Sequence, residues 1–239
     1  MNKISIIIVT YNAEKDLQAC LDSIKQQTYS PLEVVIVDGA STDGTLDIIK
    51  QNPDVVSKWI SEKDNGIYDA MNKALKMITG DWVYFIGADD TLLPDFDKMA
   101  KVLKDPNTIY YGSVLARGGK YLGHLTPYSQ AKTGICHQAM IYPKIVFDKY
   151  TFDPRFRISA DHHLNMKCYA DPAINIEFVD YIIANFNHTG ISSVQKDALF
   201  EKQKAQLILK YFGVKIWARF VFKLLKWKLL NRKEPNRAD

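Results

Sequence analysis

The sequence predicts an α/β protein built on a parallel sheet, and three observations support that prediction. Short apolar runs that suit buried strands alternate with segments of helical spacing over roughly the first 90 residues. The composition, 47% hydrophobic and 24% charged, is that of an ordinary globular protein and excludes collagen-like and wholly disordered chains. Every apolar run is shorter than the roughly 18 residues that a membrane-spanning helix needs.

The first half of the chain alternates expected strands with expected helices. Continuous β-branched runs indicate strands buried on both faces, at Ile4–Val9, Leu32–Val37, Val55–Ile60 and Trp82–Ile86. Apolar residues three or four positions apart predict helices between them, at Ala13–Gln27, Thr42–Lys50 and Ile67–Ile78. Ser41 or Thr42 is the expected N-cap of the second helix, and Gly80 is expected to end the third. Such alternation favours parallel strands joined by right-handed crossovers.

The pattern changes after Pro94. The expected elements are a hairpin of strands Ile109–Leu115 and Lys120–Leu125 around a turn at 117–119, strands at Cys136–Tyr142 and Ile174–Phe186, and helices at Ala160–Ala170 and Ser193–Phe212. We therefore expect one domain over residues 1–193, in which an α/β half (1–105) packs against a mixed half (106–193). C-terminal helices over 194–239 are expected to follow it.

Basic residues gather at the C-terminus. The chain carries +4, from 31 basic and 27 acidic residues, but the last 26 residues hold eight basic residues against two acidic ones, a net charge of +6. In this tail Trp217, Phe220, Val221, Leu224 and Leu225 fall on one predicted helical face, opposite four basic residues. Such a helix either lies on an anionic membrane surface or docks on the body of the protein, and the sequence leaves both open. The net charge is too weak to predict a nucleic-acid partner.

Cysteine usage and the N-terminus indicate the compartment. Cys20, Cys136 and Cys168 are widely spaced and odd in number, so neither a disulfide framework nor a structural zinc site is expected. The apolar run at Ile4–Val9 is too short for a signal-peptide core. We therefore expect a cytoplasmic protein.

Polar residues follow each of the four expected strands. These residues are Thr10-Tyr11-Asn12, Asp38 to Gly44, Glu62 to Gly66, and Asp89-Asp90. Parallel strands place such exits at one edge of a sheet, where ligands bind. Carboxylates there can accept from a nucleobase or a ribose, and a carboxylate pair can hold Mg²⁺ or Mn²⁺ against a diphosphate. No G-x-G-x-x-G and no P-loop motif is present, which disfavours dinucleotide binding and P-loop chemistry.

The four exits together resemble the ordered motifs of family 2 glycosyltransferases. The resemblance is carried by Val9 to Asn12, Val37 to Thr45, Asp64 to Lys73 and Gly87 to Asp90, and it extends more weakly to about residue 193. Members of this family are inverting, nucleotide-sugar-dependent enzymes. The resemblance therefore implies a GT-A type α/β fold, in which a Rossmann-like parallel sheet carries a mixed acceptor-side half and, here, a C-terminal amphipathic helical tail.

The resemblance also implies a donor site. Thr10, Tyr11 and Asp38 would line the base pocket, while Asp64 and the Asn65-Gly66 turn would close over the nucleotide. The same motifs contribute four further expected donor-binding residues, Asn12, Gly39, Asp69 and Asn72.

The family's metal motif is incomplete in this chain. Asp89 would face the ribose and take part in metal binding, and Asp90 would hold the Mn²⁺ or Mg²⁺ ion. The first acidic position of the motif is Gly87, so the metal is expected to bind mainly together with the donor diphosphate.

The catalytic base is expected in the second half. The segment Ile158 to Leu164 resembles the one that bears the family's base, which implies that Asp161 takes the proton from the acceptor hydroxyl. Asp161 could also N-cap the helix that follows it. His162 is expected either to contact the acceptor or to face solvent, and His137-Gln138 either to lie beneath the sugar or to be structural. His188 is a possible extra metal ligand.

The leading interpretation is an inverting glycosyltransferase. It would move a hexose or N-acetylhexosamine from a UDP-sugar to a glycan or lipid-linked acceptor, in bacterial surface polysaccharide or lipopolysaccharide synthesis. The protein would lie at the cytoplasmic face of the inner membrane through its basic helix. One alternative is a membrane-peripheral scaffold that binds nucleotide sugars. The other is a sugar-1-phosphate nucleotidyltransferase, which needs a basic Gly-rich loop that Thr10 to Ala13 lacks.

Overall fold

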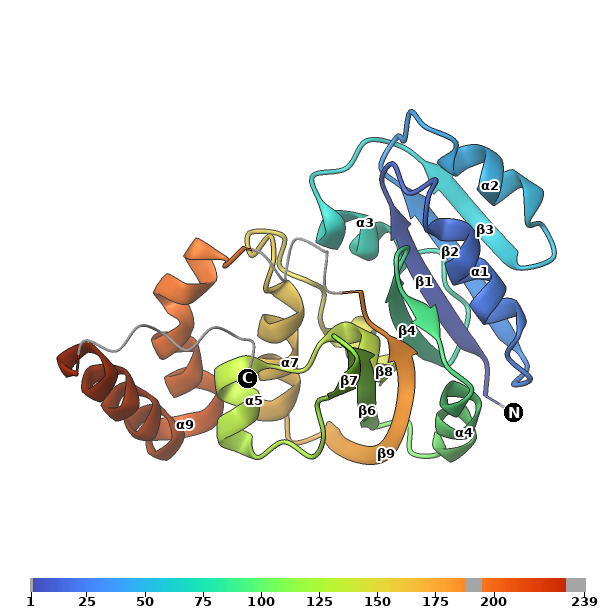
Figure 1. The fold of residues 1–239 in the computed structure, drawn as a ribbon. Coiled ribbons are helices and arrows are strands. Elements are labelled where there is room, and N and C mark those ends of the chain that lie inside the picture. Colours follow the sequence, from blue (N-terminus) through green and yellow to red (C-terminus); the bar gives the residue numbers. More distant parts are fainter. Residues whose placement is uncertain (1, 188–194, 231–239) are drawn as a thin grey trace.

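The protein is an α/β molecule with one mixed sheet. The computed structural model describes residues 2–187 and 195–230. Within them a nine-stranded sheet has the order β3-β2-β1-β4-β8-β6-β9-β5, with β7 added beside β6 (Figure 1). The strands are β1 (Ile4–Thr10), β2 (Leu32–Asp38), β3 (Val56–Ser61), β4 (Trp82–Gly87), β5 (Thr91–Leu92), β6 (Thr108–Ala116), β7 (Gly119–Tyr121), β8 (Met140–Pro143) and β9 (Asn175–Asn185).

Helices cover both faces of the sheet. They are α1 (Leu17–Lys25), α2 (Thr45–Gln51), α3 (Ile67–Ala74), α4 (Asp95–Val102), α5 (Pro127–Thr133), α6 (Ile145–Lys149), α7 (Ala160–Ala170) and α9 (Ala198–Leu229), with a 3₁₀ turn, η1 (His137–Ala139). Alternate residues of β1 point to opposite faces, so Ile6 packs in the cluster with α1, α2 and α4, and Ile7 in the cluster with α3 and α7. The result is a three-layer arrangement.

The predicted parallel half is confirmed. β3, β2, β1 and β4 are all parallel, and Ile4 of β1 lies opposite both Leu32 of β2 and Trp82 of β4. This register brings Thr10, Asp38 and Gly87 to one edge of the sheet. The antiparallel pairing of β8 with β4 begins the mixed half, as expected.

Helices α1 and α2 begin three or four residues later than predicted, next to loops that bind each other. The helix predicted from Ala13 begins at Leu17, because the N–H groups of Asn12 and Ala13 donate to the side chains of Ser41 and Thr45 instead. The N-cap of α2 is Gly44, so the prediction of Ser41 or Thr42 is wrong. The Ser41 hydroxyl is bound to Asp38.

After Pro94 the chain forms helices that the periodicity did not predict. α4, α5 and α6 are short, and only α5 carries a recognisable start, with Thr126 as N-cap and Pro127 in the first turn. The strand predicted at Cys136–Tyr142 divides into η1 and β8, and the strand predicted at Lys120–Leu125 is reduced to β7. The helix predicted to end at Phe212 continues through a kink at Gly213, whose φ is +76°.

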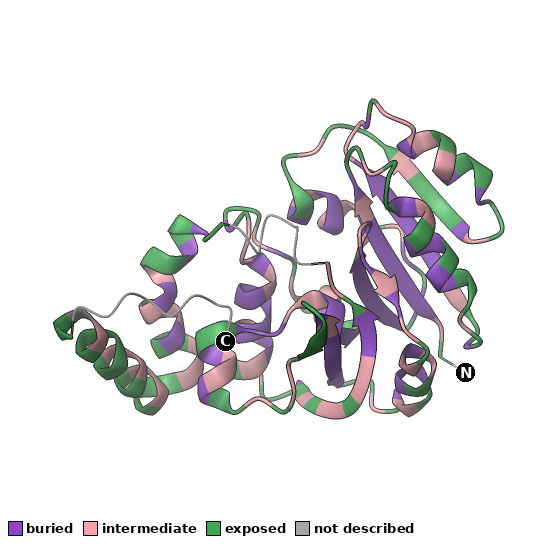
Figure 2. Ribbon diagram, viewed as in Figure 1, coloured by how far each residue is buried: buried purple, intermediate pink, exposed green. Residues whose placement is uncertain are grey.

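The kink returns the last part of α9 to the body of the protein. Ile216, Trp217 and Phe220 pack against the core, and the guanidinium of Arg219 lies 4.1 Å from the ring centre of Tyr128 on α5. The tail helix therefore docks, which was one of the two readings of its sequence. Its outer side stays exposed (Figure 2). No helix among the described residues is long and apolar enough to cross a membrane.

Candidate active site

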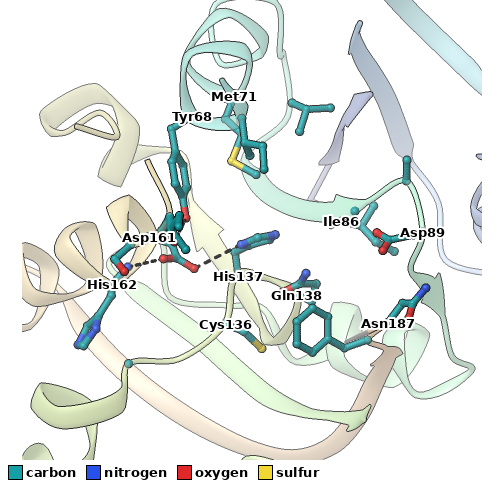
Figure 3. Close-up of a pocket in the computed structure, with 18 of the residues that line it drawn as sticks. Tyr68, Met71, Ile86, Asp89, Cys136, His137, Gln138, Asp161, His162 and Asn187 are labelled. Atoms are coloured by element: carbon teal, nitrogen blue, oxygen red, sulfur yellow. Dashed lines mark hydrogen bonds and ion pairs between the residues drawn. The ribbon is translucent and has the colours of Figure 1, made fainter. Parts of the chain in front are cut away.

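A pocket of about 450 Å³ lies where the carboxyl ends of the parallel strands meet the second half. Its walls come from the exits of β1 and β4, from α3, from η1 and from the start of α7 (Figure 3). Two carboxylates mark opposite sides of it, Asp89 after β4 and Asp161 in the first turn of α7. The sequence motifs of both halves therefore converge on one site.

Asp161 lies in the pocket wall with both carboxylate oxygens near a partner. Oδ1 accepts from the backbone N–H of His162 at 2.7 Å, and Oδ2 lies 3.4 Å from Nδ1 of His137. Burial by itself would raise the pKa of Asp161, but His137 and His162 together outweigh that effect and lower the pKa below the usual range, with His137 the larger contributor of the two. The N-cap of α7 is Ser159, so the alternative role of Asp161 as N-cap is wrong.

The two aspartates after β4 differ in exposure. Asp89 is half-buried and lines the pocket, and burial followed by the neighbouring charge of Asp90 raises its pKa. Asp90 is 1% exposed and accepts from the N–H of Asn187 at 2.7 Å, from Nε2 of Gln138 at 2.9 Å and from the N–H of Gly87 at 3.2 Å. Asp90 therefore ties three segments together and does not line the pocket, and its role as a metal ligand stays a prediction.

The lack of a side chain at Gly87 leaves room for the carboxylates of Asp89 and Asp90. A Cβ at this position would lie 2.7 Å from Oδ2 of Asp90 and 2.8 Å from Oδ1 of Asp89, closer than carbon and oxygen can approach. The residue that departs from the metal motif therefore leaves room for the two that follow it. In the part of the chain that the structure describes, no three His, Cys, Asp or Glu side chains form a metal cluster. Asp89 is the one residue of the expected metal pair that lines the pocket.

The buried carboxylate of Asp38 organises the donor side. It accepts from the hydroxyls of Thr10, Ser41 and Ser61 and from the N–H of Ser41. These hydrogen bonds outweigh burial and lower the pKa of Asp38. Because Asp38 and Thr10 are 0% and 4% exposed, the expectation that they line the base pocket is corrected. Tyr11 and Asn12, by contrast, line the pocket, and Tyr11 is 69% exposed.

The Asp64–Lys73 motif is split between a loop and helix α3. Oδ1 of Asp64 accepts from the N–H of Gly66, and Oδ2 lies 2.7 Å from where a Cβ of Gly39 would be, so Asp64 lies directly against Gly39. Asp64 and the other expected donor residues of this motif lie outside the pocket. The N–H of Asn65 donates to Asp69, and the Asn72 side chain exchanges two hydrogen bonds with the backbone of Phe152. Asn72 is therefore a clamp between α3 and the segment before α7.

The residues expected on the acceptor side have three different roles. His137 lines the pocket between Asp161 and Asp89 (Figure 3). Gln138 is buried and supports the site through Asp90. The His162 ring turns away from Asp161 and lies 3.0 Å from the carbonyl oxygen of Gln130, so the prediction of a solvent-facing side chain is wrong. His188 lies outside the described residues.

The sequence did not predict several of the pocket residues, among them Tyr68, Arg117 and Arg157. Tyr68 donates to the carbonyl of Ile158, and burial followed by the negative charge of Asp161 raises its pKa. Arg117 and Arg157 are exposed and line the pocket from the β6–β7 turn and from the segment before α7. Tyr68 lies inside the Asp64–Lys73 motif, which was a usable signal. The arginines had none, because their loops come together only in the fold.

Comparison with known proteins agrees with this geometry. The family model described as "Glycosyl transferase family 2" matches residues 5–160. A protein named "PGL/p-HBAD biosynthesis glycosyltransferase" from Mycobacterium tuberculosis (strain H37Ra) is 37% identical over 216 residues, which covers 83% of this chain and 82% of the relative.

Solved structures share the fold. S. aureus TarS 1–349 in complex with UDP-GlcNAc has a TM-score of 0.74 at 21% identity, covering 92% of this chain and 71% of TarS 1–349. The mannosyltransferase PcManGT from Pyrobaculum calidifontis, in complex with GDP-Man and Mn²⁺, has a TM-score of 0.62 at 22% identity, covering 88% of this chain and 63% of the other. These likenesses confirm the predicted GT-A type α/β fold.

Proposed function

The chain belongs to glycosyl transferase family 2, and from that premise we propose that it transfers a hexose or N-acetylhexosamine from a UDP-sugar to a glycan or lipid-linked acceptor. The observation that carries the proposal is the single pocket that Asp89 and Asp161 line from opposite sides. One side suits a donor diphosphate and the other suits an acceptor hydroxyl. The UDP-GlcNAc bound to TarS supports UDP as the nucleotide.

The transfer is a single displacement with inversion. The acceptor hydroxyl attacks the anomeric carbon as the bond to the diphosphate breaks, and the Asp161 carboxylate accepts the hydroxyl proton. Asp161 suits this role because it lines the pocket and because its lowered pKa keeps it ionised at neutral pH. An α-linked donor would then give a β-linked product.

A divalent cation, Mn²⁺ or Mg²⁺, would be held by Asp89 and the donor diphosphate. The fit rests on Asp89, whose half-buried carboxylate lines the pocket. Burial, followed by the neighbouring charge of Asp90, raises the pKa of Asp89, and a bound cation would favour its ionised form. The Mn²⁺ bound to PcManGT supports a metal at such a site. When bound, the ion neutralises charge that develops on the leaving diphosphate.

The outer face of the tail helix would rest on an anionic membrane surface. Val214, Phe222, Leu225 and Leu229 are between 53% and 85% exposed and fall on one helical face, away from the docked side chains. Exposed Lys215 and Lys226 lie beside this face along the helix. Apolar side chains bordered by cations are the pattern of an interfacial helix. A lipid-linked acceptor would be presented at that surface.

A donor screen by thermal shift tests the proposed function. The protein is mixed with Mn²⁺ and, in separate samples, with UDP, UDP-sugars, GDP-mannose or ADP-glucose. The compounds of one nucleotide should raise the melting temperature, because they bind only the folded protein. UDP compounds are expected to give the largest rise. If no nucleotide diphosphate or nucleotide sugar changes the melting temperature, the donor pocket is refuted.

Transfer is then measured with the donor that the screen identifies. Asp161→Asn should keep the donor-induced shift yet lose about two to four orders of magnitude in turnover, the usual contribution of a general base. Asp148→Asn is the matched control, because the Asp148 side chain is exposed and its carboxylate pairs with Lys144 away from the pocket. Near-normal turnover of Asp161→Asn would refute its role as base. A scaffold protein would show neither transfer nor hydrolysis of any donor.

A further inference from the structure

His137 occupies a place in the pocket that the proposed reaction does not yet use. Its ring lies between Asp161 and the side where Asp89 stands, with Nδ1 directed at Oδ2 of Asp161 (Figure 3). The His137 and Asp161 side chains are 16% and 17% exposed, so water is largely excluded from the contact between them. Charges interact more strongly in such surroundings than at an open surface.

The position of His137 is fixed by its neighbours in the 3₁₀ turn. The hydroxyl of Tyr84 in β4 donates to the carbonyl of Gln138 at 2.8 Å, and the Gln138 amide donates to Asp90 at 2.9 Å. The turn itself is closed by the N–H of Ala139, which donates to the carbonyl of Cys136. The imidazole is thus anchored to the buried end of β4 before any substrate binds.

Asp161 needs a partner of this kind because burial opposes its charge and most of the groups around it are neutral. The groups that face it are the imidazoles of His137 and His162, the phenols of Tyr68 and Tyr142, and the thiol of Cys136. Burial and the charge of Asp161 raise the pKa of both phenols and of the thiol, so these three groups are neutral. The His162 ring is directed at the carbonyl of Gln130. His137 is the group that contacts the free oxygen, Oδ2.

We propose that His137 is a positioning residue for the transfer reaction, whose imidazole holds the Asp161 carboxylate ionised and oriented to receive the acceptor proton. This inference rests on the proposed function for the reaction, but the pairing itself is a property of the free protein. Nδ1–H donates to Oδ2, while the His162 N–H holds Oδ1. With the imidazole removed, the buried carboxylate takes up a proton at higher pH and can no longer accept one from the acceptor.

The first test titrates the Asp161 carboxyl by ¹³C NMR in the free protein and in two variants. His137→Ala should raise the Asp161 pKa by about one unit or more, because the larger of the two histidine contributions that oppose burial is lost and only that of His162 remains. His137→Asn places an amide donor near the position of Nδ1 and should keep most of the lowered pKa. His124→Ala, which removes an exposed histidine outside the pocket, is the matched control and should leave the titration unchanged.

The second test follows kcat/KM against pH with the donor identified by the screen. The acidic limb of the His137→Ala profile should move to higher pH by the same interval as the carboxyl titration, with activity partly recovered above it. In His137→Asn the acidic limb should lie close to the pH at which it lies in the normal protein. A residue that only supports the fold would lower the rate at all pH values without moving the limb.

Two results would overturn the inference. One is an Asp161 carboxyl that titrates identically in the normal protein and in His137→Ala. The other is a loss of rate in His137→Ala that is equal at every pH. If the normal protein transfers no sugar from any donor, the proposed function fails, and the NMR titration still decides the pairing.

Discussion

The four aspartates that follow the sequence motifs differ in how far they are buried. Asp38 and Asp90 are buried, and protein donors bind both oxygens of each. Asp89 and Asp161 are part-exposed and line the pocket. The four therefore divide into two that hold the loops and two that line the pocket.

The two aspartates after β4 provide the first prediction. Asp89→Asn should abolish the Mn²⁺-dependent part of the donor-induced thermal shift without lowering the melting temperature, because the raised pKa shows that its charge is disfavoured in the fold. Asp90→Asn should lower the stability of the free protein by about 1–3 kcal/mol, since an amide cannot accept all three hydrogen bonds.

Urea denaturation and donor titration of both variants separate these effects. Asp47→Asn changes an exposed aspartate of α2 that lies outside the pocket; it is the control and should bind donor normally. The prediction would be contradicted if Asp90→Asn were as stable as the normal protein and lost the Mn²⁺-dependent thermal shift while Asp89→Asn kept it. Asp90 would then be the metal ligand.

At the scale of the elements, side chains of one strand hold the ends of others. Glu33 on β2 is 3% exposed, and it accepts from Ser5 of β1 and from Thr79 in the segment before β4, while its carboxylate pairs with Lys58 of β3. This network joins the amino-terminal region of the parallel half, opposite the edge where the pocket lies. Burial alone would raise the pKa of Glu33, but the hydrogen bonds outweigh burial and lower it from 4.5 to about 2.

Acid should therefore weaken the parallel half through Glu33. A carboxylate with a lowered pKa stabilises the fold above its unfolded pKa of 4.5 and loses that contribution as the pH falls towards 2. The shift corresponds to about 3 kcal/mol at neutral pH. Urea denaturation between pH 2 and 7 should show this loss in the normal protein and a smaller acid dependence in Glu33→Gln.

The exposed Glu177→Gln is the matched control for Glu33→Gln, and it should lose stability in acid as the normal protein does. An unchanged acid dependence in Glu33→Gln would show that the network around Glu33 does not couple to unfolding.

At the scale of the whole molecule, the tail helix has two faces with different partners. Trp217 and Phe220 pack on the core, and Arg219 and Lys223 lie over the ring of Tyr128. The sequence left open whether the face with Trp217 and Phe220 meets a membrane or the body, and the structure packs it against the body. Phe222 belongs instead to the outer face, where 68% of its surface is exposed.

Vesicle co-sedimentation tests the outer face. The protein should bind phosphatidylglycerol–phosphatidylcholine vesicles more tightly than phosphatidylcholine vesicles, and salt should weaken the binding. Replacing Phe222 and Leu225 by Ser should reduce the affinity about tenfold or more, because two apolar side chains no longer enter the interface. Their exposure means that the change should leave the melting temperature near normal.

Leu209→Ser is the control for the vesicle experiment, since Leu209 is also apolar and 44% exposed but lies before the kink. Equal binding of the double variant and the normal protein to anionic vesicles would refute the membrane-facing role of the outer face.

Much of the fold could be predicted from the sequence because its signals are local. The strands at Ile4, Leu32 and Trp82 were predicted within a residue or two, since a continuous β-branched run suits a strand buried on both faces. The helix predicted from Ala13 was too long, because the N–H groups of Asn12 and Ala13 bind a loop some thirty residues away. Short helices such as α6 have too few turns to show a period.

The sequence by itself determined the family, the parallel half and the set of carboxylates from which the site is made. Only the tertiary structure decided their roles. Asp90 is excluded from the pocket by a hydrogen bond from Asn187, 97 positions along the chain, and Asp161 meets His137 across 24 positions. The face of the tail that stays free was decided by the kink at Gly213. Burial and pairing depend on contacts between distant segments, and no local pattern of residue types encodes them.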